Sequence, residues 1–221
     1  MNSTKSDWLA PAALVALSFV PAVAGTVRLL QLARDVNITP ENARFFAAPI
    51  PVLLHIPAVI AFSLLGAFQF SRMFRRRHRG WHRMVGKILI PCGVIAALSG
   101  LWMAQFYPWP PGDGQLVYIE RLLAGTAMFA SIVLSVRAIL ARDYTAHGAW
   151  MMRAYAIGLG AGTQVLTHLP WFVFSDAKPG ELPRAVMMGV GWVINIVVAE
   201  WIIRARRTVA ASRGAVTAQA F

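Results

Sequence analysis

The sequence predicts an all-α membrane protein, a bundle of six transmembrane helices with both termini in the cytoplasm. Of the 221 residues, 57% are hydrophobic and only 14% are charged, well below the roughly 25% of soluble domains. The apolar residues fall in blocks of about 20, the length that crosses the hydrocarbon core of a bilayer. Most basic residues gather on one side of the predicted membrane. We therefore expect a single integral membrane domain over residues 1–221.

Six hydrophobic segments are the predicted helices, and a cytoplasmic tail is expected to follow them over residues 204–221. In chain order the segments are Trp8–Leu30, Ala48–Phe70, Val85–Phe106, Val117–Leu140, Trp150–Phe174 and Ala185–Ile203. Prolines and glycines over residues 107–114 predict a short rigid turn between the third and fourth segments.

The first segment has a second interpretation, as a cleaved signal peptide. Lys5 precedes the apolar run, and Ala22-Val23-Ala24 resembles a cleavage site. The run is longer than a usual signal core and continues to Leu30, which favours a retained helix. Cleavage would move the new N-terminus outside and leave the other helices unchanged.

The basic residues orient the predicted bundle. Fifteen of the 21 lysines and arginines lie at the N-terminus, after the second segment, around the start of the fifth, or in the tail. The other six are balanced by six acidic residues, so the net charge of +12 lies on the first side. Cytoplasmic loops carry an excess of Lys and Arg. The sequence therefore predicts a multi-pass protein of the bacterial inner (plasma) membrane with these segments inside.

The loop before the third segment holds the densest basic run, which includes Arg75, Arg76, Arg77 and Arg79. Basic clusters directly beside a membrane helix attract anionic lipids. We expect these four arginines to contact lipid phosphate at the cytoplasmic face. Nucleic-acid binding, which the net charge alone would suggest, is not expected from this position.

Histidines are the main candidates for chemistry, because polar side chains are costly inside a membrane. His82 and His147 lie at the predicted inner ends of the third and fifth segments, and His55 and His168 lie near the outer ends of the second and fifth. His78 lies within the arginine run and is expected to be solvated. The outer pair shares a His-x-Pro pattern, which in most membrane helices only shapes the helix near its end.

Helical phase adds Gln69 to the inner level. It follows His55 by fourteen residues, which places the two within about 40° of each other on a helix. We expect His82 and His147 to approach each other near the cytoplasmic interface, with Gln69 close by. Small residues continue the stripes that these histidines begin, and close helix packing explains them more simply than room for a flat cofactor.

A set of local motifs resembles a family of bacterial membrane proteins catalogued as domain-of-unknown-function family 2306. The motifs are His55, Gln69-Phe70, His82-Arg83 with Gly86, and His147 with Trp150-Met151 and Arg153. The resemblance covers about residues 50–160, half of the chain. It implies no activity, and His168 lies outside the pattern.

The arrangement is more loosely similar to cytochrome b-561 proteins, six-helix electron carriers with two bis-histidine haems. This chain departs from them because its fourth segment has no histidine, only Glu120 and Arg121 at the outer end. His147 and His168 share one segment, and their spacing corresponds to a rise of about 31 Å, close to the full core thickness. One haem b or metal, or none, is therefore easier to reconcile with the sequence than two.

Two functions stay open. The first is electron transfer through a b-type haem or a quinone site, with His82 and His147 as the first choice of iron ligands and His55 and His168 as the second. The second is a non-redox role as an assembly factor, sensor or small-solute transporter, in which the His/Arg/Gln cluster is structural or lipid-binding.

In the redox interpretation, Arg83 and Arg153 would pair with haem propionates, because guanidinium groups suit carboxylates. The chain has no Cys-x-x-Cys-His motif, which excludes covalently attached haem. The partners expected from sequence are then the bilayer itself, anionic lipid at the cytoplasmic face, and a quinone or a redox protein.

Overall fold

The computed structural model describes residues 3–34, 36–71, 75 and 77–218, and these are helical apart from short connections. The helices are α1 (Ser3–Leu32), α2 (Ala43–Ala47), α3 (Pro49–Gln69), α5 (Arg79–Phe106), α6 (Gln115–Leu140), α7 (Tyr144–Gly158), α8 (Gly160–Phe174) and α9 (Glu181–Ala218). The all-α fold class is confirmed for these residues.

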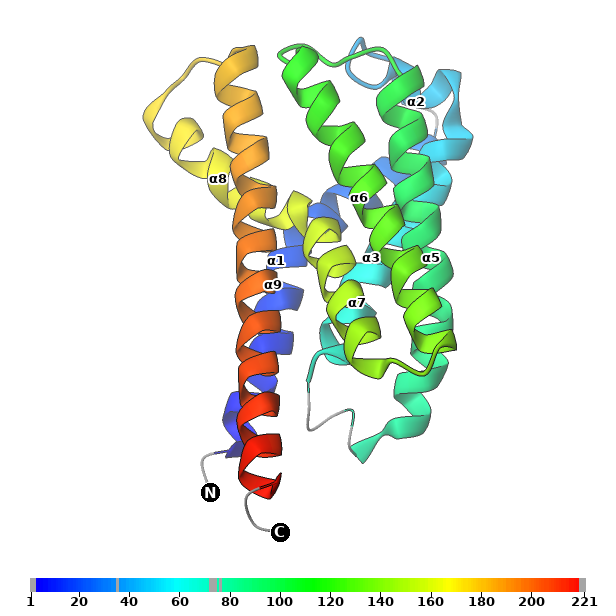
Figure 1. Ribbon diagram of the computed structural model, residues 1–221. Coiled ribbons are helices and arrows are strands. Elements are labelled where there is room, and N and C mark those ends of the chain that lie inside the picture. Colours follow the sequence, from blue (N-terminus) through cyan, green and yellow to red (C-terminus); the bar gives the residue numbers. More distant parts are fainter. Residues whose placement is uncertain (1–2, 35, 72–74, 76, 219–221) are drawn as a thin grey trace.

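The long helices run side by side, and both ends of the chain lie at the same end of the bundle (Figure 1). Helices α3, α5 and α6 pack in sequence, α7 packs against α6, and α8 lies between α1 and α9. The end of the bundle at which α5 begins is named the arginine end. The opposite end, which holds the loop over residues 107–114, is named the proline end.

Five helices are long and apolar enough to span a membrane: α1 from Trp8, α3, α5, α6, and α9 as far as Thr208. They agree with five of the six predicted segments. α5 begins six residues earlier than predicted, at Arg79, so Arg79 and Arg83 already lie on this helix. α9 continues well beyond Ile203, so the predicted tail begins as a helix.

The fifth predicted segment, Trp150–Phe174, is not one continuous helix as the sequence suggested. It divides into α7 and α8, each of 15 residues and each too short to cross a bilayer alone. Together they lead from the arginine end to the proline end, with a sharp change of direction between them (Figure 1).

Glycines account for the break between α7 and α8. Gly160 lies against the indole of Trp192 and Gly162 lies against the backbone of Leu17, so neither position has room for a Cβ atom. Leu159 then accepts two backbone hydrogen bonds, from Gly162 at 3.0 Å and from Thr163 at 3.3 Å. The glycines let neighbouring helices approach closely, and the chain bends where they do.

Asn195 of α9 compensates the break. Its Nδ2 donates to the carbonyl oxygen of Ala156 at 3.0 Å, and its Oδ1 accepts from the hydroxyl of Thr163 at 2.7 Å. A break at residue 160 deprives the Ala156 carbonyl of its usual donor four residues later. Irregular backbone at membrane depth is tolerated only where other protein groups complete its hydrogen bonds. The Asn195 side chain bonds to one residue on each side of this bend, Ala156 before it and Thr163 after it.

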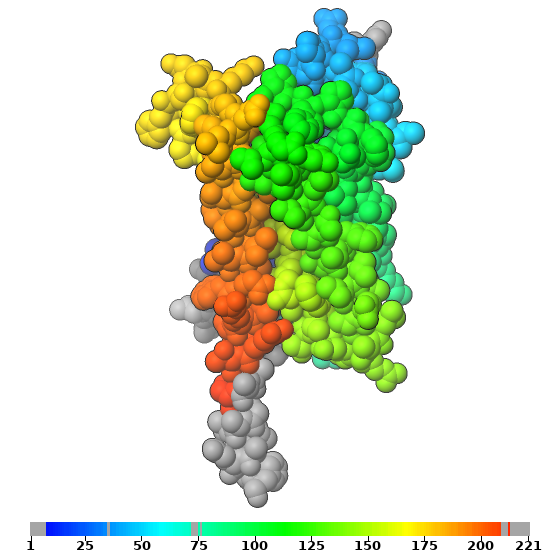
Figure 2. Space-filling model, turned by 45° about the horizontal axis from the view of Figure 1, so that its top comes forward, coloured from blue at the N-terminus to red at the C-terminus, as the bar shows by residue number. Residues whose placement is uncertain are grey.

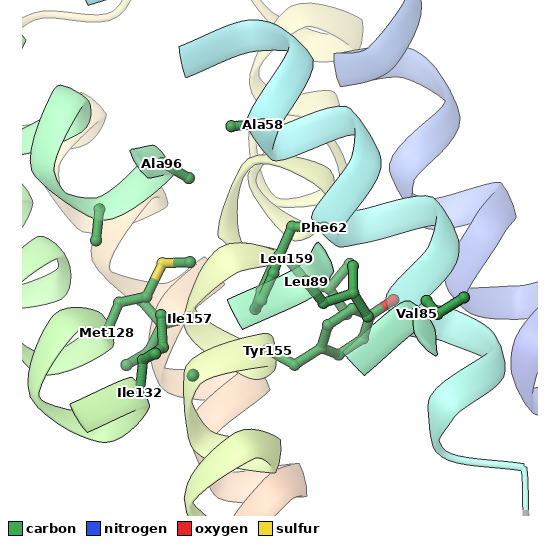
Figure 3. Packing of buried hydrophobic residues seen from close by; sticks show 12 residues of the cluster. Ala58, Phe62, Val85, Leu89, Ala96, Met128, Ile132, Tyr155, Ile157 and Leu159 are labelled. Carbon is green, nitrogen blue, oxygen red and sulfur yellow. The ribbon is translucent and has the colours of Figure 1, made fainter. Parts of the chain in front are cut away.

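The core lies between α3, α5, α6 and α7 (Figure 3). Phe62 is 1% exposed at its centre, and Leu89, Ile132 and Leu159 are packed in the same cluster. Tyr155 points from α7 toward α3 and donates its hydroxyl to the Ser63 carbonyl at 2.7 Å. In lipid, such helices associate through close packing and hydrogen bonds rather than through the hydrophobic effect.

The outer surface of the bundle is apolar, as expected for contact with lipid. Many large side chains of α1, α8 and α9 are more than half exposed, including Phe19, Phe172 and Trp201. The end of α8 and the loop after it stand out from the side of α9 (Figure 2). Together with the long apolar helices, this surface shows a membrane protein.

Candidate functional site: a cavity beside the broken helix

A cavity of about 340 Å³ lies in the proline-end half of the bundle, where α3, α5, α6, the α7–α8 break and α9 meet. The break contributes four lining residues, Ile157, Gly158, Ala161 and Gln164. Small residues of α5 and α6, such as Gly100 and Gly125, line the opposite walls. Ligand pockets of proteins are typically ~300–1,000 Å³, so the volume suits a small molecule.

His55 is the one histidine of this cavity. Its Nδ1 lies 3.0 Å from the carbonyl oxygen of Ala96 and 3.0 Å from the hydroxyl of Ser99. A carbonyl oxygen only accepts hydrogen bonds, so Nδ1 carries the proton and Nε2 keeps a free lone pair. His55 is therefore fixed as an acceptor, in the tautomer that metal ligands and general bases also use.

Gln164 reaches the cavity from the first turns of α8. Its amide nitrogen donates to the Met188 carbonyl of α9 at 3.3 Å, which leaves the amide oxygen and the second N–H for a ligand. The break in the fifth segment places this side chain there, because α8 departs at an angle from the axis of α7 (Figure 1). The cavity thus contains two side chains that can accept a hydrogen bond from a ligand, His55 and Gln164.

Basic residues border the cavity at the proline end. Arg44 of α2 donates to the Pro108 carbonyl at 3.3 Å and lies 4.7 Å from the centre of the Phe45 ring. Burial, followed by repulsion from Arg121, lowers the pKa of the Arg44 guanidinium. Burial also raises the pKa of the Tyr107 hydroxyl, which donates to the carbonyl of residue 48 at 2.6 Å.

Asp113 holds the proline end together. Its side chain is 1% exposed and pairs with Arg121 of α6 and Arg184 of α9, each at 2.5 Å. The carboxylate therefore ties the 107–114 turn to two helices and fixes Arg121 beside the cavity. Nearby, Glu120 has a buried carboxylate oxygen without a hydrogen-bond partner, and this side chain faces Gly189 of α9.

His168, the other predicted outer histidine, does not line this cavity. Its Nδ1 donates to the Gln164 carbonyl one turn earlier at 2.7 Å, and its ring stacks on Phe172. The structure therefore separates the roles of the outer pair: His55 lines the cavity, and His168 lies along α8.

At the arginine end, Gln69 and His82 are neighbours, as the sequence suggested. The Gln69 amide nitrogen donates to the His82 carbonyl at 3.5 Å. The hydrogen bonds of His147 go to α6, from Nδ1 to the Ser135 hydroxyl at 2.7 Å and carbonyl at 3.2 Å. His82 Nδ1 is buried without a partner among the described residues.

Arg153 has a different partner from the one expected. Its Nε and Nη2 donate to both carboxylate oxygens of Glu200 on α9, at 2.5 and 3.1 Å, and its guanidinium lies 4.4 Å from the centre of the Trp150 ring. Such a bidentate pair occupies the fork that a propionate would need. Arg153 therefore joins α7 to α9.

Three arginines of the basic run, Arg75, Arg79 and Arg83, line a second hollow together with His82. Arg79 and Arg83 are nevertheless exposed, as are Arg77 and His78, which do not line the hollow. Arg76, the remaining arginine of the predicted lipid-binding set, lies outside the described residues. Within the part of the chain that the structure describes, no three His, Cys, Asp or Glu side chains are grouped as metal ligands.

Sequence reasoning missed the cavity itself and two of its polar residues, Arg44 and Gln164. The available signal was the run of glycines at 158, 160 and 162 inside an apolar segment. Interrupted hydrophobic segments mark binding sites in many membrane transporters. Gly158 and Gly162 also belong to the stripe of small residues that begins at His147, for which close packing is the simpler explanation.

A scan of family models matches residues 52–203 to the predicted membrane protein family DUF2306. No curated protein and no solved structure matches the chain. The match covers five of the six predicted hydrophobic segments and most of the cavity lining, and it extends the sequence resemblance beyond residue 160. The chain therefore belongs to the DUF2306 family of membrane proteins.

Proposed function

We propose that this protein binds a quinol, the dihydroxy form of a quinone, in the cavity beside the α7–α8 break. The observation that carries the proposal is the fixed tautomer of His55, which leaves a hydrogen-bond acceptor, Nε2, on a side chain that lines the cavity. This is the quinone-linked form of the electron-transfer function that the sequence suggested.

The hydrogen-bonding pattern favours a ligand with two donors. His55 Nδ1 is committed to Ala96, and the Gln164 amide nitrogen is committed to Met188. What remains for a ligand is the acceptor Nε2 of His55 and, on Gln164, the amide oxygen and one N–H. A quinol carries hydroxyl donors at opposite edges of a flat apolar ring, and these can bond to both acceptors. An oxidised quinone has only acceptors there and could not bond to His55 Nε2.

The remainder of the lining suits the ring and the beginning of a lipid tail. Trp109, Trp192 and Met128 supply flat or adaptable apolar surface, and Gly100 and Gly158 leave room beside it. A quinone-class molecule dissolves in the bilayer, so it can reach a pocket that lies between lipid-exposed helices. Two arginines at the proline end, Arg44 and Arg121, also line the pocket.

A bis-histidine haem b receives less support from this geometry. Each of the two hollows contains one histidine, His55 in the larger and His82 in the smaller. Arg153, one of the two expected propionate partners, is paired with Glu200. His147 does have a free Nε2 that could bind iron, so haem binding is tested separately. We expect an optical spectrum of the purified, dithionite-reduced protein to lack the sharp bands of a low-spin haem b.

We also propose that the arginine end faces the cytoplasm of a bacterial cell and that the quinol cavity lies in the outer half of the inner membrane. The excess of Lys and Arg at the arginine end supports this orientation. The cavity would then exchange protons with the outer side, through the end of the protein that carries Arg44, Arg121 and Asp113.

Extraction of bound quinones tests the proposed function. The protein is purified in a mild detergent from cells that make quinones, and the lipid extract is quantified by chromatography. We expect close to one quinone-class molecule per chain for the natural protein and little for Ala161→Phe, which fills the cavity beside the break. The matched control is Ala130→Phe, an exposed alanine of α6 that does not line the cavity. Equal quinone content in both variants would contradict the proposal.

A further inference from the structure

A second hollow, of about 270 Å³, lies at the arginine end beside the first turns of α5. Its lining consists of basic side chains alone: Arg75, Arg79, His82 and Arg83. The sequence from Ser71 to Lys87 contains no acidic residue. Glu200, the acid paired with Arg153, is engaged on the other side of the bundle between α7 and α9.

The backbone adds to the positive charge. α5 has 28 residues, and the side chain of its N-cap residue, His78, makes no cap hydrogen bond to the first turn. The N–H groups of that turn therefore point out of the helix without an intrahelical acceptor, and the helix dipole places partial positive charge there. A long helix that begins next to three arginine side chains is a favourable place for an anion.

Two buried polar atoms at the base of this region lack partners among the described residues. They are Nδ1 of His82, which lines the hollow, and Oε1 of Gln69, whose side chain is nine-tenths buried and contacts the His82 backbone. Buried polar atoms are rarely left unsatisfied in native proteins. The hollow therefore lies beside a polar region of the bundle, and His82 itself lines it together with the arginines.

We propose that this hollow binds the phosphate group of an anionic phospholipid. Three guanidinium groups and a histidine provide donors for several phosphate oxygens, and charge-assisted bonds of this kind are the strong ones. The site is more specific than the basic run that the sequence suggested, because Arg75, Arg79 and Arg83 converge with His82 while the exposed Arg77 does not. It is independent of the quinol cavity at the other end of the bundle.

The surroundings favour a lipid over a soluble phosphate. Trp81, beside the hollow in sequence, packs edge-on against Phe68, and tryptophan prefers the headgroup depth of a membrane. Met84 and Ile88, on the next turns of α5, are 57% and 46% exposed. Acyl chains that descend from a phosphate in the hollow would cover apolar side chains of this kind.

Native mass spectrometry of the full chain, titrated in detergent with phosphatidylglycerol, tests the proposal. We expect Arg79→Gln/Arg83→Gln to weaken the tightest lipid adduct at least about tenfold, the loss expected for one or two charge-assisted bonds. The matched control, Arg77→Gln, removes an arginine from the same run outside the hollow and should change the affinity less than about twofold. His82→Ala should weaken binding as well, whereas His78→Ala should not.

Two results would overturn the proposal. Equal losses per removed charge for Arg77→Gln and for the Arg79/Arg83 variant would mean that the basic run attracts lipid only by its total charge. Binding of phosphatidylcholine as tight as that of phosphatidylglycerol would exclude an anionic lipid. A parallel titration with inorganic phosphate separates the sources, since binding of free phosphate at equal affinity would contradict the lipid. The melting temperature of each variant is measured first, and only variants that melt like the natural protein are compared.

Discussion

At the scale of single residues, its place in the larger cavity distinguishes His55 from the other histidines of the bundle. The Ala96 carbonyl fixes a proton on Nδ1, and the free Nε2 belongs to a side chain that lines the larger cavity. His147 and His168 also bond through Nδ1, yet neither lines this cavity. The surroundings of the ring, rather than its presence in a membrane helix, therefore identify the candidate.

His55→Ala tests this assignment. Loss of one neutral hydrogen bond in a dry pocket should weaken quinol binding about fivefold to tenfold, because such a bond contributes ~1 kcal/mol. Calorimetric titration of the purified protein with a short-chain quinol, in the absence of oxygen, measures the change. His168→Ala is the control, since its ring bonds only to its own helix and stacks on Phe172. A larger loss for His168→Ala than for His55→Ala would reverse the assignment.

Sequence predicted some of these residues well and others poorly, for a physical reason. His55, Gln69 and His82 were recognised because ionisable or amide groups are rare inside apolar segments. The partner of Arg153 was not recognised, because Glu200 lies 47 residues away on another helix. Sequence shows which polar groups are costly to bury, but the tertiary packing decides which partner satisfies each of them.

At the scale of helices, the break between α7 and α8 is the feature that creates the cavity. Five helices matched the prediction because a long apolar run has few alternatives in lipid. The fifth segment did not, because its glycines suit close packing within a straight helix as well as a bend. The bend depends on Trp192, Leu17 and Asn195, which belong to other helices.

Asn195→Leu tests the role of this side chain in the bend. The substitution leaves the Ala156 carbonyl and the Thr163 hydroxyl without their partner, and each buried unsatisfied group costs about 1–3 kcal/mol. We expect the free energy of unfolding, measured by titration with a denaturing detergent, to fall by about 2 kcal/mol. Thr163→Val removes only one of the two bonds and should cost less. A change below about 0.5 kcal/mol for Asn195→Leu would show that the bend needs no such support.

At the scale of the whole molecule, charge and apolar surface are arranged as a membrane requires. Apolar side chains cover the sides of the bundle, and the two chain ends, the start of α5 and the start of α7 lie at one end (Figure 1). The basic excess of the sequence lies at that end as well. These features support the predicted orientation, and they place the two hollows at opposite ends.

Reporter fusions test the orientation. A periplasm-active reporter inserted into the turn over residues 107–114 should be active, and one fused after Arg213 should be inactive, because cytoplasmic loops carry the excess of Lys and Arg. A cytoplasm-active reporter at the same two positions serves as the control and should give the opposite pattern. The reverse result with both reporters would place the quinol cavity in the inner half of the membrane.

The most direct test of the central claim compares two ligands that differ only in their hydroxyl protons. Calorimetric titration of the natural protein measures the affinity of a short-chain quinol and of its dimethyl ether, which has the same ring and no donor. If His55 Nε2 and the Gln164 oxygen accept the two hydroxyls, the quinol should bind at least about tenfold more tightly, because the ether leaves both acceptors unpaired. Equal affinity for the two ligands, or no binding of either, would contradict the proposal.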